Sequence, residues 1–151
     1  MEYKEGLNKA AAFCAQAEHC RSEVVDKLEK WGVEPDDSEA IVEYLLKEGY
    51  LNEGRYAEFY VRDKYRLNKW GRIKIEYSLR QKGVDRGAIY SALETIDQEL
   101  YMDNLCELLR VKARSVSSKD EYDKRAKLFR FAASRGFDSE EISKALGRLE
   151  Q

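Results

Sequence analysis

The sequence predicts an all-α protein that consists of three tandem three-helix repeats in an elongated, curved array. Charged residues make up 37% of the 151 residues and Pro35 is the only proline, a composition typical of a helix-rich chain. A short sequence motif with a glycine at its centre also occurs three times. The glycines are Gly32, Gly83 and Gly136, which are 51 and 53 residues apart. Because a unit of about 50 residues buries little apolar surface alone, we expect the three copies to stack and share a core.

Each copy opens with an amphipathic segment that predicts its first helix. These segments cover approximately residues 7–17, 52–67 and 97–114. On this basis we place the three repeats at residues 1–50, 51–97 and 98–151.

The glycine of each copy predicts the end of the second helix. A glycine just past a helix takes the left-handed conformation without a Cβ penalty, so Gly32, Gly83 and Gly136 are expected helix stops. Apolar residues lie eight and four positions before each glycine, which puts each pair on one helical face. The pairs are Val24 and Leu28, Ile75 and Leu79, and Leu128 and Ala132.

An aspartate four residues before an isoleucine predicts the start of the third helix, because each aspartate is placed to cap it. In the third copy Glu141 completes a capping box with Asp138, and Val84 and Phe137 can each pack on the isoleucine as a hydrophobic staple. The first copy is three residues longer here, so its sequence does not predict whether it has a hydrophobic staple. The pairs are Asp37 and Ile41, Asp85 and Ile89, and Asp138 and Ile142.

An arginine also recurs eleven residues before each glycine, at Arg21, Arg72 and Arg125. It lies on the same face as the apolar positions. We therefore expect its stem to cover the core edge and its head to reach a neighbouring carboxylate or helix C-terminus. Arg72 lies in the basic second repeat. Among the three arginines it is therefore the one that we expect to have a role beyond this structural one.

The sequence shows no motif for catalysis, a metal or a cofactor. It has no glycine-rich phosphate loop and His19 has no evident partner, so we expect neither an enzyme nor a bound cofactor or metal. Cys14, Cys20 and Cys106 form neither an even disulfide set nor a CxxC pair, and we interpret them as reduced thiols. With no membrane-length apolar run and no secretion signal, we expect a cytoplasmic monomer.

Basic charge is concentrated between Leu51 and Arg86. That segment holds ten basic and five acidic side chains, so its net charge is +5, while the whole chain is at −2 and the remainder at −7. The excess predicts a polyanion or an acidic protein surface as the partner of the second repeat. The candidate partner-binding residues are Arg55, Arg62, Lys64, Arg66, Lys69, Arg72, Lys74, Arg80 and Lys82.

Aromatic residues are interleaved with these basic residues. Side chains of this kind can stack on nucleic-acid bases, but their helical spacing favours a place in the core for most of them. The residues are Tyr56, Phe59, Tyr60, Tyr65 and Trp70.

Two stretches around the second repeat resemble the signature of the RecX family of RecA regulators. They are GYLNEGRYAEFYVRDK, from Gly49 to Lys64, and NKWGRIKIEYSLRQKGV, from Asn68 to Val84. HCRSEVVDKLEKWGV and KLFRFAASRGFDSEEISKAL resemble the family's first and last repeats, so the similarity covers nearly the whole chain. Residues at matching places in the signature are Gly49, Tyr50, Leu51, Arg55, Tyr56, Ala57, Val61, Arg62, Gly71, Arg72, Ile73, Leu79, Lys82 and Gly83.

The chain departs from the signature at two places. Asn52 and Glu53 replace an acidic pair, and Tyr77 stands where leucine is common. Asn52 can still cap a helix, so we expect the fold to be kept.

The resemblance implies three three-helix repeats that bind in the groove of the RecA–DNA filament, contact adjacent protomers, and restrain recombinase activity and filament growth in recombination and DNA repair. It implies no reaction and no cofactor. A direct DNA-binding module, for single- or double-stranded DNA, is the alternative, since three-helix units with a basic helix are common among helix-turn-helix proteins. The pI of about 5.7 argues against it. A helical adaptor with an unrelated partner is a third interpretation.

Overall fold

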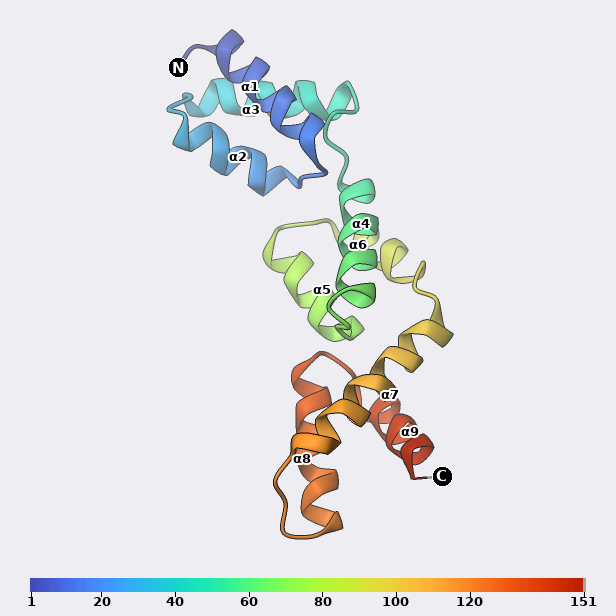
Figure 1. Ribbon diagram of the computed structural model, residues 1–151. Coiled ribbons are helices and arrows are strands. Elements are labelled where there is room, and N and C mark those ends of the chain that lie inside the picture. The colour runs from blue at the N-terminus through green and yellow to red at the C-terminus, as the bar shows by residue number, and fades with distance from the viewer. Residues whose placement is uncertain (151) are drawn as a thin grey trace. The chain divides into compact units, whose positions relative to one another are not determined.

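The computed structural model describes residues 1–150, and within that range the chain forms nine helices and no strand (Figure 1). Three consecutive helices fall in each repeat, which confirms the predicted all-α fold of three three-helix repeats. The helices are α1 (Tyr3–Gln16), α2 (Arg21–Lys30), α3 (Pro35–Lys47), α4 (Glu53–Arg66), α5 (Arg72–Gln81), α6 (Arg86–Leu93), α7 (Gln98–Ser115), α8 (Glu121–Ser134) and α9 (Ser139–Leu149).

The chain packs as two compact units whose boundary cuts through the second repeat. Unit 1 comprises Met1–Phe59 and Leu79–Ala92, and unit 2 comprises Tyr60–Ser78 and the chain from Leu93 onward. Helices α4 and α5 therefore contribute residues to both units, and α1–α3 and α7–α9 each lie within one. A repeat of the sequence is not a packing unit of the structure.

The apolar face predicted for the second helix is buried in every repeat. In unit 1, α1, α2 and α3 pack together around Ala10, Ile41 and Leu45, which have no exposed surface. In unit 2, α7 packs against both α8 and α9, and its Leu105 and Leu109 are completely buried. These contacts form the cores that a single helix pair could not supply.

The second helix of each repeat ends at its glycine. Gly32, Gly83 and Gly136 have φ angles of +76°, +77° and +99°, in the left-handed region that glycine adopts without strain. The N–H of the residue after each glycine donates back to a carbonyl five residues earlier in the chain, at 3.0, 3.1 and 3.3 Å. This is the pattern of a Schellman helix end, and it satisfies carbonyls that would otherwise have no partner.

The third helices begin as predicted in two repeats and differently in the first. Asp138 forms the predicted capping box with Glu141, and Asp85 accepts hydrogen bonds from two N–H groups at the start of α6. The prediction that Asp37 caps α3 is wrong, because α3 begins at Pro35 and Asp37 lies in its first turn. Proline fixes the backbone angle that the first helical position requires, so α3 starts three residues earlier than a cap at Asp37 would place it.

The first helices agree with the predicted segments except at the start of α1. It begins at Tyr3, four residues before the predicted segment, and α4 and α7 lie within one residue of their predictions. Asn52 accepts a hydrogen bond from the Arg55 N–H at 2.9 Å, so it caps α4 as expected.

Aromatic residues of α4 divide between the core and the surface. Tyr56 and Tyr65 are buried as predicted, but Phe59 is 46% exposed, so its assignment to the core is wrong. The buried face of α4 contains Ala57 and Val61, and Phe59, midway between them along a 3.6-residue helix, points away from it.

Successive repeats join in the same way at two places, which we name junctions 1 and 2. At junction 1, within unit 1, the Ser22 hydroxyl donates to the Lys82 carbonyl at 2.8 Å and the Arg21 N–H to Glu53 Oε1 at 3.3 Å. Each junction thus places the start of one repeat's second helix against the glycine turn and first helix of the next repeat.

Junction 2, within unit 2, repeats this arrangement with main-chain donors. The N–H of Gly71 donates to the Arg135 carbonyl at 2.7 Å, and that of Ile73 to the Gly136 carbonyl at 3.0 Å. The N–H of Arg72 donates to the Tyr101 hydroxyl at 2.8 Å. Burial raises the pKa of Tyr101 far above its usual range, so this hydroxyl keeps its proton and donates it to Glu141 at 3.2 Å.

Two glycines allow the backbones to meet at junction 2. A Cβ on Gly71 would lie 2.2 Å from the Gly136 carbonyl oxygen, and one on Gly136 would lie 2.5 Å from the Cβ of Lys74. Gly136 therefore ends α8 and also receives the start of α5, a second role that its place in the sequence does not reveal.

The recurring arginines reach carboxylates, as predicted. Arg21 lies 3.6 Å from Glu43 and Arg125 pairs with Glu150, both within their own repeats. Arg72 instead crosses junction 2, where it lies 3.4 Å from Glu141.

We expect Gly71→Ala to destabilise unit 2 by more than about 2 kcal/mol, because the added methyl meets main-chain atoms that have little room to move. Urea unfolding followed by circular dichroism measures the change. Gly147→Ala is the matched control: a Cβ there meets nothing within 4 Å in α9, and alanine favours a helix by about 0.5–1 kcal/mol. Equal stabilities of the two variants would contradict the close approach.

A second prediction concerns Glu53, whose Oε2 atom is buried without a hydrogen-bond partner. Burial raises the pKa of this carboxyl, and the nearby charges of Asp85 and Glu23 raise it further. The hydrogen bond from the Arg21 N–H and the Arg21 charge lower the pKa but do not offset the increase. The folded state therefore favours the protonated form of Glu53. The stability that the protein gains from this is fully present below the pKa of the unfolded state, and it is lost as pH rises through the pKa of the folded state. We expect Glu53→Gln to raise stability at pH 7 by about 0.5–1 kcal/mol and to have no effect below about pH 4.

Denaturant unfolding at several pH values tests this. Glu58→Gln, at an exposed position of the same helix, serves as the control. A Glu53→Gln variant that is less stable than the wild type at pH 7 would show that the Arg21 contact outweighs burial.

Candidate partner-binding surface

The nine candidate residues fall in both units. Each group is described within its own unit. Unit 1 contains Arg55, Arg80 and Lys82, and unit 2 contains Arg62, Lys64, Arg66, Lys69, Arg72 and Lys74.

In unit 2 the structure brings Lys64 and Lys74 together around Trp70. The Lys64 Nζ lies 4.8 Å and the Lys74 Nζ 4.4 Å from the centre of the indole ring, and the ring itself is half-buried. An ammonium at this distance is attracted by the negative face of the ring. We name these three residues the Trp70 cluster.

The end of α4 places Trp70 there. Lys69 has a φ of +56°, and it is the only non-glycine residue with a positive φ among residues 1–150. This left-handed turn lets the Trp70 N–H donate to the Lys64 carbonyl at 3.0 Å, so the indole returns to the last turn of α4. Lys74 arrives from the first turn of α5, which junction 2 holds in place.

Tyr60 supports the cluster from one turn earlier in α4. The Lys64 ammonium lies 5.3 Å from its ring, and its hydroxyl is hydrogen-bonded to Ser78 of α5. Two cations are therefore held beside two aromatic rings on one part of unit 2. Helical spacing favours the core for most aromatic residues of this segment and does not indicate this role of Trp70, which depends on the left-handed turn at Lys69.

Three candidate residues form contacts within the chain. Arg55 donates to Glu18 at 2.6 Å and to the Gly49 carbonyl at 3.0 Å, Lys82 lies 3.6 Å from Glu23, and Arg72 crosses junction 2. Substituting any of them would change contacts within the chain together with any binding surface.

Of the four remaining candidates, two lie beside a tyrosine side chain. Arg66 stacks on Tyr65, with its guanidinium 5.5 Å from the ring centre. Arg80 donates to the Tyr90 hydroxyl at 3.4 Å. Arg62 is exposed on α4, and Lys69 is half-buried.

Among residues 1–150, no three histidine, cysteine or acidic side chains lie close enough together to hold a metal ion. His19 stacks on Phe13 with ring centres 3.7 Å apart and is hydrogen-bonded to Glu23. Burial raises the pKa of the Cys14 and Cys20 thiols, which keeps both protonated. No helix in this range combines the length and apolar character needed to cross a bilayer.

The acidic charge outside the basic segment is uneven. Residues 1–50 hold twelve acidic and six basic side chains, a net charge of −6, whereas residues 87–151 have a net charge of −1. The −7 of the remainder thus belongs almost entirely to the first repeat.

Three family models match the chain in order. They describe the first, second and third three-helix domains of RecX and match residues 7–45, 52–93 and 99–146. A regulatory protein RecX from Clostridium perfringens is 33% identical over 150 residues, which cover 98% of this chain and 70% of that protein. One from Chlorobium phaeobacteroides is 29% identical, and the match covers 97% of this chain and 94% of that protein.

Solved structures are similar over the whole fold. The crystal structure of RecX from Lactobacillus salivarius matches with a TM-score of 0.87 and 25% identity, over 98% of this chain and 96% of that chain. A crystal structure of a regulatory protein RecX with 21% identity has a TM-score of 0.89 over 96% of this chain and 73% of that chain, and it supports the fold alone.

The Trp70 cluster predicts a charge-selective fluorescence response. In a Trp31→Phe background Trp70 is the only tryptophan, and two ammonium groups beside it should attract iodide and repel caesium. We expect iodide to quench its emission several-fold better than caesium, and Lys64→Gln/Lys74→Gln to remove most of that difference. Lys112→Gln/Lys127→Gln, at lysines of α7 and α8, is the control and should leave the ratio unchanged.

Proposed function

Since this chain belongs to the RecX family of regulatory proteins, we propose that it binds the filament that RecA recombinase forms on DNA and restrains the recombinase. The observation that carries the proposal is the basic second repeat, whose lysines the fold gathers at the Trp70 cluster. A filament on DNA presents both acidic protein surface and phosphate, and an excess of ten basic over five acidic side chains is suited to either.

The division of charge supports an oriented contact. The first repeat, at −6, is repelled by the phosphates that attract the second repeat, at +5 between Leu51 and Arg86. This difference would turn the second repeat toward DNA or acidic protein and the first repeat away from it. We propose that the first repeat faces basic surface of the recombinase or solvent.

The proposed outcome is inhibition of the recombinase, its ATPase and the extension of its filament. The test is the DNA-dependent ATPase of RecA from the same organism, with this protein added at amounts too small to cover the DNA. Suppression at these amounts is the expected result. An unchanged ATPase at equimolar protein would contradict the proposal.

We expect Lys64→Glu/Lys74→Glu to weaken filament binding about tenfold or more, because two attractive charges become repulsive at one site. Fluorescence anisotropy of labelled protein on preformed filaments measures the affinity. Lys9→Glu/Lys27→Glu is the matched control: these lysines also lie over aromatic rings, each 5.5 Å from the ring centre, but in the acidic first repeat. Equal losses in both double variants would mean that net charge matters and the location of the lysines does not.

A direct DNA-binding module is the second candidate function, and the Trp70 cluster is the observation that favours it. An indole flanked by two lysines can stack on a base while the ammonium groups meet phosphates. Binding dominated by phosphates falls steeply with salt, whereas a filament contact with mixed character loses less. Tight, salt-sensitive binding to bare DNA together with an unaffected ATPase would favour this alternative.

A further inference from the structure

The second helix of the third repeat starts one turn earlier than its counterparts. Helices α2 and α5 start at the recurring arginines, Arg21 and Arg72, whereas α8 starts at Glu121, four residues before Arg125. All three helices end two residues before their glycine. The third repeat therefore has an additional turn at the N-terminal end of α8, residues 121–124, which we name the extra turn.

The extra turn changes which N–H groups are available. The first N–H groups of a helix have no partner inside it, and at both junctions the N–H of the recurring arginine donates to the next repeat. In α8 the corresponding Arg125 is the fifth residue, so its N–H bonds within the helix. The N–H of Lys124, the counterpart of Gly71, donates to the Asp120 carbonyl at 3.0 Å. The main-chain donors that hold a following repeat are thus used internally.

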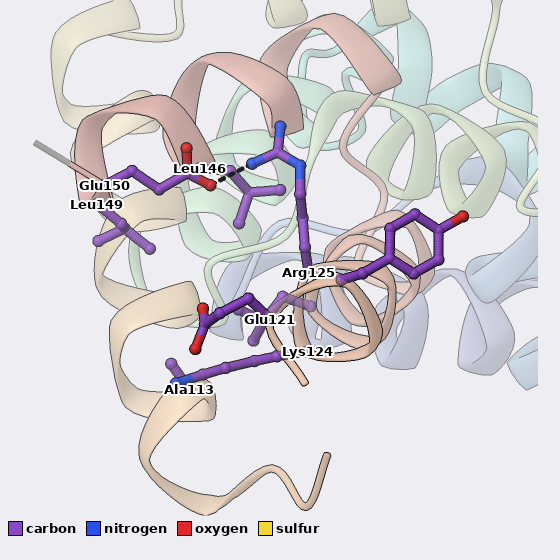
Figure 2. A pocket seen from close by; sticks show the side chains of 9 residues that line it. Ala113, Glu121, Lys124, Arg125, Leu146, Leu149 and Glu150 are labelled. Carbon is purple, nitrogen blue, oxygen red and sulfur yellow. Dashed lines mark hydrogen bonds and ion pairs between the residues drawn. The ribbon is translucent and has the colours of Figure 1, made fainter. Parts of the chain in front are cut away.

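Side chains also cover the start of α8. Lys124 carries a Cβ at the position of Gly71, where a Cβ would lie 2.2 Å from the oxygen that it faces, although Cys20 holds the same position at junction 1. Figure 2 shows Arg125 directed to Glu150 of its own repeat, with Glu121 and Lys124 of the extra turn lining the same pocket. The equivalent Arg72 is directed to Glu141 of the repeat that follows, whereas Arg21 pairs with Glu43 of its own repeat, as Arg125 does with Glu150.

We propose that the extra turn closes the third repeat against a further repeat, and that the partner it excludes is the first repeat of a second copy of this chain. The first repeat carries the same glycine turn as the other two, with a φ of +76° at Gly32. Within residues 1–150 no second helix docks on this turn, and its Gly32 carbonyl accepts a hydrogen bond from the N-terminal ammonium of Met1 at 3.2 Å. Without the extra turn, the start of α8 would match the start of α5, and the Gly32 turn would match the turn that α5 receives.

Charge would favour this head-to-tail contact. The first repeat has a net charge of −6, and α8 carries four basic side chains against two acidic ones before its last turn. A contact of this kind does not close on itself, so copies would add to one another without limit.

The test removes the extra turn and measures molecular mass. Asp123→Pro/Lys124→Gly disfavours helix before residue 123, removes the Lys124 Cβ, and lets α8 start near Arg125, as α5 starts at Arg72. Multi-angle light scattering over a range of concentrations should give 17.6 kDa for the wild type at all of them and a mass at least twice that for the variant at high concentration. Adding Gly32→Ala should return the variant to 17.6 kDa if this turn receives α8 as the Gly136 turn receives α5, since a Cβ on Gly136 would lie 2.5 Å from the Cβ of Lys74.

Three outcomes would overturn the proposal. The first is a variant that keeps its helical signal and remains at 17.6 kDa at every concentration. The second is a variant that unfolds, with the milder Glu121→Gly/Lys124→Gly unfolding too, which would show that the turn is needed for folding. The third is a wild type that itself assembles through these surfaces. The proposal stands apart from the proposed function, because its test requires no recombinase and no DNA.

Discussion

The structure depends on the unpaired N–H groups at the start of the second helix in each repeat. The first turn of any helix leaves such groups without an intrahelical partner, and leaving one buried and unpaired costs about 1–3 kcal/mol. In the first two repeats the next repeat supplies the acceptor, through Glu53 at junction 1 and Tyr101 at junction 2. Stacking of the repeats is therefore favoured by main-chain hydrogen bonds as well as by apolar burial.

This requirement also fixes the candidate binding surface. Arg55, Arg72 and Lys82 are held by contacts that join the repeats, so each already has a carboxylate partner within the chain. The same docking orients the start of α5 and with it Lys74, which completes the Trp70 cluster. The part of the surface that remains basic is thus a consequence of how the second and third repeats join.

The sequence was sufficient for the features that depend on local geometry. Glycines past helix ends, apolar pairs four residues apart and an aspartate before a helix each act within one turn, so Gly83, Leu79 and Asp138 have their predicted places. Features that depend on contacts between repeats were missed. Nothing in the local sequence indicates that Gly71 must meet Gly136, or that a left-handed lysine returns Trp70 to α4.

The division of the second repeat between two units has a consequence for the order in which the protein is made. Unit 1 needs residues 79–92 in addition to the first repeat, so the ribosome must release nearly two repeats before the first can cover its junction. Residues 60–78 are synthesised earlier than 79–92, yet they belong to unit 2 and wait for α7–α9. The middle of the chain therefore reaches all of its packing partners only after the last helix has been synthesised.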